Sequence, residues 1–279
     1  MMFKLGVSLF IKEAILFGLT LGLGLYAAYS YSFYLGDVVQ DVSVSFNRTD
    51  LIILLILFGA IFLISRYKKV AGLSFKIFLV LVVFSGTQVI LGTLIPSSWD
   101  LLATLFFTFI FVVGKNVTVH NLGIILGIGG IAAVFGLSIS VELGLILLVV
   151  LSFYDIVAVY ATKHMVTMAK GMIEAGAVFG FLIPMEFKGF FYNKDQARAG
   201  IGENFMVLGS GDIGLPLIFA SSLIKISLLS AIITAAFSML GLFLTHILFV
   251  NQFRRRAMAA LPPIATMTII GYLISLFLV

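Results

Sequence analysis

The most constraining feature of the sequence is a series of long apolar runs that contain almost no charged residues. A helix needs about 20 mostly apolar residues to cross the hydrocarbon core of a membrane. Hydrophobic residues fill 62% of the 279 positions and charged residues only 10%, whereas a soluble domain carries about 25% charged residues. Too few polar side chains remain to cover a soluble core, so lipid must be the solvent for most of this chain.

We count nine of these runs as spanning helices, and the second and fourth are short enough that we expect them to extend into flanking polar residues. Strands of a membrane barrel would alternate in polarity, and these unbroken runs do not. The sequence therefore predicts an all-α, polytopic membrane protein with nine transmembrane helices. The predicted helices cover approximately residues 14–33, 51–65, 77–95, 101–114, 122–139, 143–160, 205–222, 226–250 and 261–279.

The basic residues are concentrated in alternate loops of this arrangement. Lysine and arginine mark cytoplasmic loops, and all of the 17 basic residues except Arg48 and Lys225 fall on one predicted side. We expect a cytoplasmic N-terminus, an extracellular C-terminus and an uncleaved first span rather than a signal peptide. The chain then forms one integral domain, with a six-helix part (1–160), a cytoplasmic or interfacial loop (161–204) and a three-helix part (205–279). The net charge of +5 thus reflects membrane topology and not nucleic-acid binding.

Two aspartates lie inside the predicted spans, Asp155 in the sixth and Asp212 in the seventh. A charged side chain in a spanning helix costs about 2.5–3.5 kcal/mol on insertion scales, so each aspartate needs a partner or a purpose. Because the two helices are consecutive and antiparallel, both carboxyl groups are expected at a similar depth below the cytoplasmic face. Two close carboxylates in a low-dielectric site share a proton, as general acid-base hydrolysis requires. Two alternative roles remain for these aspartates, a buried structural pair and proton carriers in a proton-coupled transporter. Separately, His246 in the eighth span is expected to bond to a neighbouring helix.

Three short motifs carry a resemblance to a known family. They are Tyr154-Asp155, the GxGD tetrad from Gly209 to Asp212, and "AALPP" from Ala259 to Pro263. In this order, on spans six, seven and nine, they resemble the motifs of the presenilin and signal peptide peptidase family of intramembrane aspartyl proteases. The family's Pro-Ala-Leu stands here as Ala259, Ala260 and Leu261, so the leading proline is absent, while the Leu-Pro step from Leu261 to Pro262 is present.

The resemblance implies a presenilin-like fold and an aspartic endopeptidase that hydrolyses peptide bonds within transmembrane segments of other proteins. It implies no cofactor or metal, and the absence of cysteine excludes thiolate chemistry. It assigns Asp155 and Asp212 as the catalytic dyad. It gives a substrate-binding or active-site-shaping role to Tyr154, Gly209, Ser210, Gly211, Ala260, Leu261 and Pro262.

Further expectations concern the loop, the substrates and the setting of the enzyme. The segment 176–191 is an interfacial re-entrant piece, a disordered loop or a strand-forming gate. The topology resembles that of presenilins, so we expect single-span substrates with an extracellular N-terminus. The small size is similar to that of a microbial, archaeal homologue in a prokaryotic plasma membrane, in contact with lipid and without obligate partner subunits. A type IV prepilin or preflagellin peptidase and a proton-coupled transporter are the alternative functions.

Overall fold

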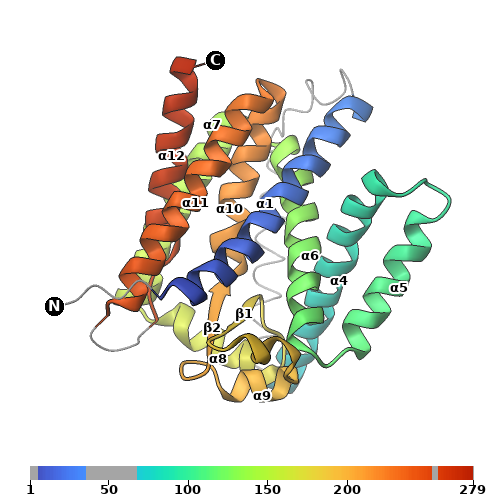
Figure 1. Ribbon diagram of the computed structural model, residues 1–279, viewed down its shortest axis with the longest axis vertical. Helices are drawn as coiled ribbons and strands as arrows, with labels where there is room; N and C mark the ends of the chain where they lie inside the picture. The colour runs from blue at the N-terminus through green and yellow to red at the C-terminus, as the bar shows by residue number, and fades with distance from the viewer. Residues whose placement is uncertain (1–5, 36–67, 253–256, 279) are drawn as a thin grey trace.

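The computed structural model describes residues 6–35, 68–252 and 257–278 of the chain. Figure 1 shows a helical bundle with a small structured cap at one end, built from α8, α9 and a β-hairpin. The elements are α1 (Val7–Leu35), α4 (Lys68–Leu94), α5 (Asp100–Val113), α6 (Val117–Ser138), α7 (Val141–Ile156), η1 (Val157–Ala161), α8 (His164–Ala175), β1 (Gly180–Pro184), η2 (Phe187–Phe191), α9 (Lys194–Ala199), β2 (Phe205–Gly209), α10 (Ser210–Ser222), η3 (Leu223–Lys225), α11 (Leu228–Val250) and α12 (Leu261–Leu278).

The described helices support a polytopic membrane protein. Six of them are long and apolar enough to cross a membrane: α1, α4, α6, α7 with η1, α11 and α12. The helix α5 has 14 residues and α10 has 13, so each is about 20 Å long and shorter than a hydrocarbon core of about 30 Å. The predicted second span, 51–65, lies outside the described residues. Each of the other predicted spans contains a helix.

The fold is mostly helical, as expected, and it also contains one pair of short strands. The segments 180–184 and 205–209 form an antiparallel pair of strands in which Gly180 is paired with Gly209 and Pro184 with Phe205. The seventh predicted helix therefore begins at Ser210, and its expected first five residues form β2. A short apolar run beside glycine is compatible with either a strand or a helix, so periodicity alone does not separate the two.

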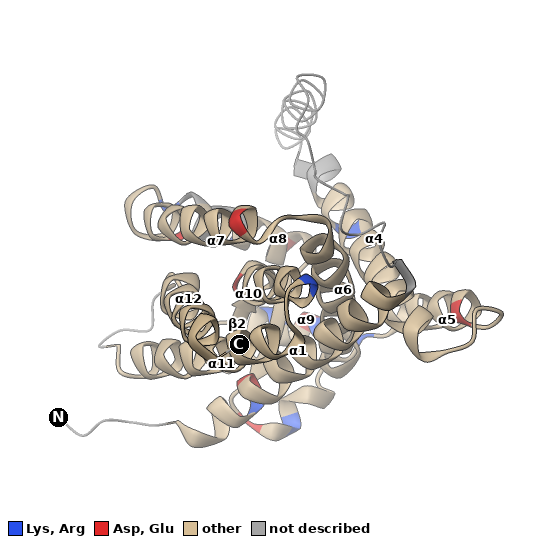
Figure 2. Ribbon diagram, turned by 90° about the horizontal axis from the view of Figure 1, so that it is seen from above, with Lys and Arg blue, Asp and Glu red and all other residues tan. Residues whose placement is uncertain are grey.

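The helix α10 occupies the centre of the bundle and contacts α1, α6, α7, α11 and α12. Figure 2 shows α10 between α7, α12 and α11 on one side and α6 on the other, with α5 at the periphery. The small residues of α6 allow close packing, since a Cβ atom on Gly127 or Gly130 would meet the backbone of α4 at Val83 or Gly86. Between helices in lipid, such close approach replaces the hydrophobic driving force available in water.

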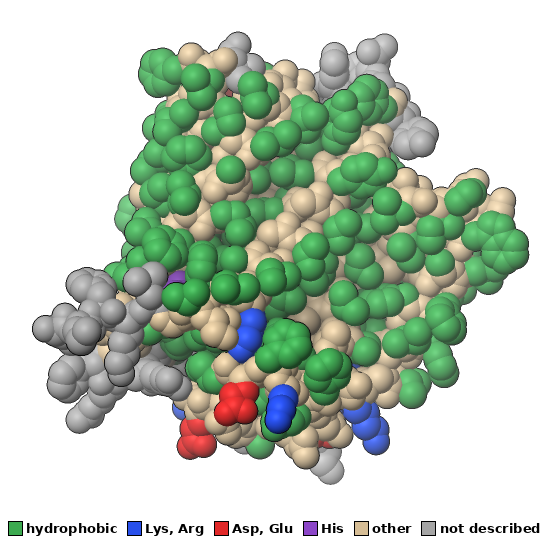
Figure 3. Space-filling view, in the orientation of Figure 1, with side chains coloured by type: hydrophobic (Ala, Val, Ile, Leu, Met, Phe, Trp, Pro, Cys, Tyr) green, Lys and Arg blue, Asp and Glu red, His purple; other side chains and the backbone are tan. Residues whose placement is uncertain are grey.

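The outer surface is divided between an apolar body and a charged end. Figure 3 shows hydrophobic side chains over the helices of the bundle and charged side chains gathered at the end that carries α8, α9 and the hairpin. The exposed apolar residues of α5 include Phe106 and Phe109, which are 66% and 65% exposed. This division places the helices in lipid and the cap at a membrane surface.

Candidate active site

Asp155 lies at the end of α7, where the helix changes its geometry. The following residues, Val157–Ala161, form a π-helical turn, in which the Thr162 amide donates to the Val157 carbonyl at 2.9 Å. Single π-turns inside helices are frequent at functional sites. The Asp155 side chain is buried, and its Oδ2 accepts a hydrogen bond from the Leu261 amide at 3.3 Å. Asp155 is thereby tied to the first residue of α12.

Asp212 occupies the third position of α10, whose N-cap is Gly209. At this position in the first turn, an acidic side chain interacts favourably with the N-terminal end of the helix. A Cβ atom on Gly209 would lie 3.0 Å from Asp212 Oδ2, so the glycine keeps this space open. Pro216, four residues on, lacks the amide that would otherwise donate to the Asp212 carbonyl. The tetrad therefore fixes the carboxylate at the junction of strand and helix.

Both aspartates line one cavity of about 930 Å³, and their carboxyl groups are close enough to interact electrostatically. The rest of the wall is mostly apolar and comes from α4, α8, β2, α11 and the segment before α12. A cavity of this size admits several residues of an extended peptide. Two carboxyl groups thus lie at the wall of one mostly apolar cavity. Among the described residues, no group of three or more His, Cys, Asp or Glu side chains is placed to hold a metal ion.

The hairpin presents one edge of β2 to this cavity. On the outer edge of β1, the Asn121 side chain bonds to both the amide and the carbonyl of Leu182, at 2.9 and 2.8 Å, and His120 Nε2 lies 3.0 Å from the Gly180 carbonyl. Alternate residues of an antiparallel ladder direct their polar groups to opposite edges. Because Leu182 is paired with Val207, the amide and carbonyl of Val207 point away from β1, toward the edge of β2 that lines the cavity.

The N-terminal helix supplies two buried charged residues that the sequence analysis missed. Lys12 Nζ donates to the carbonyls of Pro184 and Met185 at 3.0 and 2.7 Å and so holds the end of β1. Glu13 lines the cavity and bonds through both carboxylate oxygens to His246 Nδ1 on α11, at 3.0 and 3.1 Å. This contact confirms that His246 bonds to a neighbouring helix. Glu13 went unnoticed because the first span was expected to start at residue 14, whereas α1 begins at Val7.

The structure brings most of the predicted site residues together. Ala260 and three of the tetrad's residues, Gly209, Ser210 and Gly211, line the cavity with the two aspartates. Leu261 is buried and contributes the amide that bonds to Asp155, while Pro262 lies in the next position of α12 and outside the cavity wall. The Tyr154 side chain is 55% exposed and is also absent from the wall. The roles predicted for all of these residues, Tyr154 and Pro262 included, stay predictions.

Comparisons with known proteins agree with this geometry. The family model described as "Signal-peptide peptidase, presenilin aspartyl protease" matches residues 13–279. Two solved structures of a presenilin family intramembrane aspartate protease are similar in fold. The structure in space group P2 has 21% sequence identity and a TM-score of 0.61, over 95% of this chain and 96% of that one. The structure in space group C222 has 19% identity and a TM-score of 0.59, over 96% and 98%. No curated protein sequence matches the chain.

The chain therefore belongs to the signal-peptide peptidase and presenilin family of aspartyl proteases. It is an integral membrane protein and an aspartic endopeptidase that cleaves membrane proteins within the membrane. This result disfavours the prepilin peptidase and transporter alternatives.

Proposed function

We propose that Asp155 and Asp212 are the catalytic dyad of this protease. The observation that carries the proposal is that α7 and α10 deliver two carboxyl groups, within electrostatic reach of each other, to the wall of the same large cavity. Two other acids of the described helices have separate structural partners: Glu13 bonds to His246, and Asp100 accepts from Gln88 at 3.0 Å. The resemblance of the sequence motifs implies the same two residues.

In the proposed reaction, the ionised carboxylate removes a proton from a water molecule while the water oxygen attacks the carbonyl carbon of the scissile bond. The protonated partner donates a hydrogen bond and then its proton to the carbonyl oxygen, giving a neutral tetrahedral diol. Collapse of the diol breaks the C–N bond. The departing nitrogen takes a proton from one carboxyl group, and a diol hydroxyl returns its proton to the other, so the dyad ends the cycle with one proton.

The substrate reaches the dyad as an extended segment in this proposal. A helical peptide bond is engaged in its own hydrogen bonds, and unwinding it in lipid leaves polar groups that need partners. The cavity-facing amide and carbonyl of Val207 are placed to pair with such a segment as an added strand. Of the three interpretations of residues 176–191, this proposal corresponds to the strand-forming gate. The strand β1 lies in that segment and pairs with β2 on the side away from the cavity.

The direction of the substrate follows from the proposed topology. The distribution of basic residues supports a cytoplasmic N-terminus, and the dyad then lies toward the cytoplasmic side, below the cap. We expect single-span substrates with an extracellular N-terminus, cleaved by the chain alone in a prokaryotic plasma membrane. The test is to reconstitute the purified protein in liposomes with one reporter segment inserted in either orientation. Cleavage confined to the opposite orientation contradicts the proposed topology.

The dyad is tested by single substitutions with a matched control. Asp155→Asn and Asp212→Asn preserve side-chain shape and remove the acid, while Asp100→Asn makes the same change at the periphery of the bundle. Loss of one member of an acid-base pair costs roughly 10²–10⁴-fold in rate. We expect each dyad variant to lose at least about 100-fold in cleavage of a membrane-embedded substrate and Asp100→Asn to stay near wild type. Full activity in a folded Asp155→Asn or Asp212→Asn variant refutes the assignment.

A further inference from the structure

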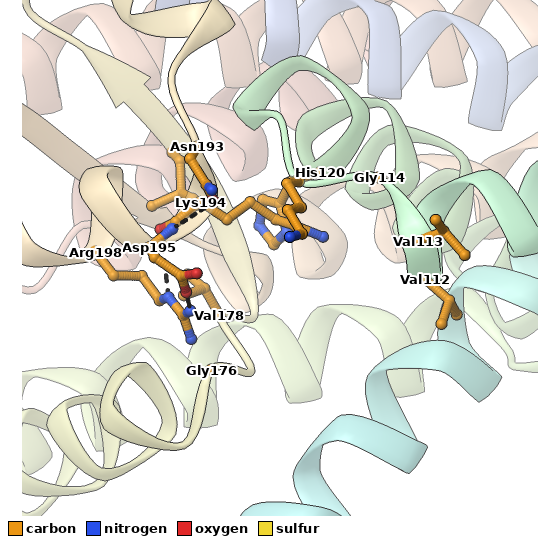
Figure 4. A pocket seen from close by; sticks show the side chains of 12 residues that line it. Val112, Val113, Gly114, His120, Gly176, Val178, Asn193, Lys194, Asp195 and Arg198 are labelled. Atoms are coloured by element: carbon orange, nitrogen blue, oxygen red, sulfur yellow. Dashed lines mark hydrogen bonds and ion pairs between the residues drawn. The ribbon is translucent and has the colours of Figure 1, made fainter.

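A second, smaller pocket of about 140 Å³ lies at the charged end of the molecule, apart from the active-site cavity. Its walls come from the end of α5, the start of α6, the turn between α8 and β1, and α9. Figure 4 shows the side chains of Asn193, Lys194, Asp195 and Arg198 gathered at one side of the pocket, with His120 from α6 beside them and the α5 residues farther away. None of these residues belongs to the proposed catalytic machinery.

The walls of this pocket are held together by backbone hydrogen bonds. The Lys194 amide donates to the Lys115 carbonyl at 2.6 Å, and the Val117 amide donates to the Tyr192 carbonyl at 3.1 Å. Gly176, at φ 81°, leaves room for the Arg198 guanidinium, which a side chain at 176 would obstruct. The backbone walls of the pocket are therefore part of the fold.

The pocket carries more positive than negative charge. Lys115, Lys194 and Arg198 line it, and Asp195, the one carboxylate among its lining residues, is paired with Arg198. Among the described residues, Lys194 forms no salt bridge; its Nζ donates to the Phe111 carbonyl at 3.3 Å and lies 5.2 Å from the centre of the Phe111 ring. Burial lowers the pKa of Lys194, and the nearby charge of Arg198 lowers it further. A lysine whose only role is to set the membrane topology would extend into water. The Lys194 side chain instead remains partly buried beside the Arg198 cation.

One side of the pocket continues into a surface that faces lipid. Val112 and Val113 form part of the wall and are 57% and 58% exposed. They end an apolar helix surface that includes Phe106 and Phe109. A ligand that fits both parts carries an anionic group for the pocket and a hydrocarbon chain for α5.

We propose that this pocket binds the phosphate group of an anionic phospholipid whose acyl chains lie along α5. Among the described residues, neither Lys115 nor Lys194 forms a salt bridge, and the lipid phosphate provides a negatively charged partner for both. Anionic lipids attract basic segments at about 1 kcal/mol per Lys or Arg near the surface. The same chemistry fits free phosphate, but the adjoining apolar surface of α5 favours a lipid.

The pocket is connected to the hairpin beside the active-site cavity. Val178 leads directly into β1, and the His120 ring, which lines the pocket, contacts the Gly180 carbonyl at the start of that strand. Occupation of the pocket should therefore hold the α8–β1 turn in place and support the strand pair. This consequence for activity rests on the proposed function, whereas lipid binding itself does not.

Binding is measured on the purified full chain in neutral detergent by native mass spectrometry, with phosphatidylglycerol titrated against phosphatidylcholine. Lys194→Gln removes the partly buried cation and Lys115→Gln an exposed one, while Lys188→Gln is the matched control outside the pocket. We expect each pocket variant to weaken phosphatidylglycerol binding about fivefold, which corresponds to about 1 kcal/mol. The control should bind as wild type.

Several outcomes overturn the proposal. Equal weakening by all three substitutions means that only general surface charge attracts the lipid. Unchanged binding by folded Lys115→Gln protein also rejects the site, even if Lys194→Gln does not fold. A parallel titration with inorganic phosphate, in which binding is detected by a change in thermal stability, distinguishes a lipid phosphate group from a free phosphate ion as the ligand. Stabilisation of wild type but not Lys115→Gln by phosphate, with no preference for phosphatidylglycerol, assigns the pocket to a soluble anion instead. Because the readout is binding, it is unaffected if the dyad assignment fails.

Discussion

Replacing Val207 with proline tests whether the open edge of β2 binds the substrate backbone. The Val207 amide points away from β1, as its pairing with the Asn121-bound Leu182 shows. Proline is tolerated at a strand edge whose amide is outside the ladder. The substitution therefore removes one donor from the cavity wall while leaving the β1–β2 hydrogen bonds in place. Val207→Ala, which keeps the amide and shortens the side chain, is the matched control.

The expected magnitude follows from the loss of one hydrogen bond. A hydrogen bond contributes about 0.5–1.5 kcal/mol net, and about 1.4 kcal/mol is a factor of ten. We expect Val207→Pro to lower kcat/KM by about 2–10-fold, with little change in thermal stability, and Val207→Ala to stay closer to wild type. The assay is initial-rate cleavage of a transmembrane reporter in liposomes, beside thermal unfolding. Wild-type kcat/KM in folded Val207→Pro, or an equal loss in Val207→Ala, refutes the strand-addition argument.

Three other predictions address the cavity and its walls. Gly209→Ala places a Cβ atom 3.0 Å from Asp212 Oδ2 and should lower both kcat and thermal stability, whereas Gly211→Ala, where an added Cβ meets nothing within 4 Å, should leave thermal stability unchanged; equal destabilisation by the two variants contradicts this. Glu13→Leu removes one partner of a buried pair and should destabilise by about 3–5 kcal/mol, while Glu13→Gln keeps an acceptor for His246 and should cost less in thermal unfolding. The pH profile of kcat/KM should be bell-shaped because one dyad carboxyl must be protonated and the other ionised; a flat profile counts against the mechanism.

The sequence predicted the helices of the bundle and the two aspartates for the same physical reason. Long apolar runs have one stable form in lipid, and a carboxyl group within such a run is costly enough to stand out. The family resemblance then joined Asp155 to Asp212, and the structure places both at one cavity. Local composition does not specify this pairing, since it depends on how α7 and α10 pack.

The features that the sequence analysis missed depend on contacts between distant segments. The run Phe205–Gly209 is as apolar as the helix that follows it, and it forms a strand because Gly180–Pro184 lies alongside. Lys12 and Glu13 resemble a charged flank of the first span, yet both are buried, with partners 172 and 233 positions away. The sequence did indicate this feature, as two adjacent charged residues within one helical turn of an apolar run. The span was expected to start at residue 14, so both residues were placed outside it.

The most direct test of the central claim is a double-mutant cycle on the dyad. Single-turnover cleavage of a membrane-embedded substrate is measured for wild type, Asp155→Asn, Asp212→Asn and the double variant in the same liposomes. Because two groups that share one proton act as a unit, their losses are not additive. We predict that each single variant loses nearly all the activity and that the double variant is no slower than either. Additive losses, or a single variant that retains wild-type turnover, would contradict the account.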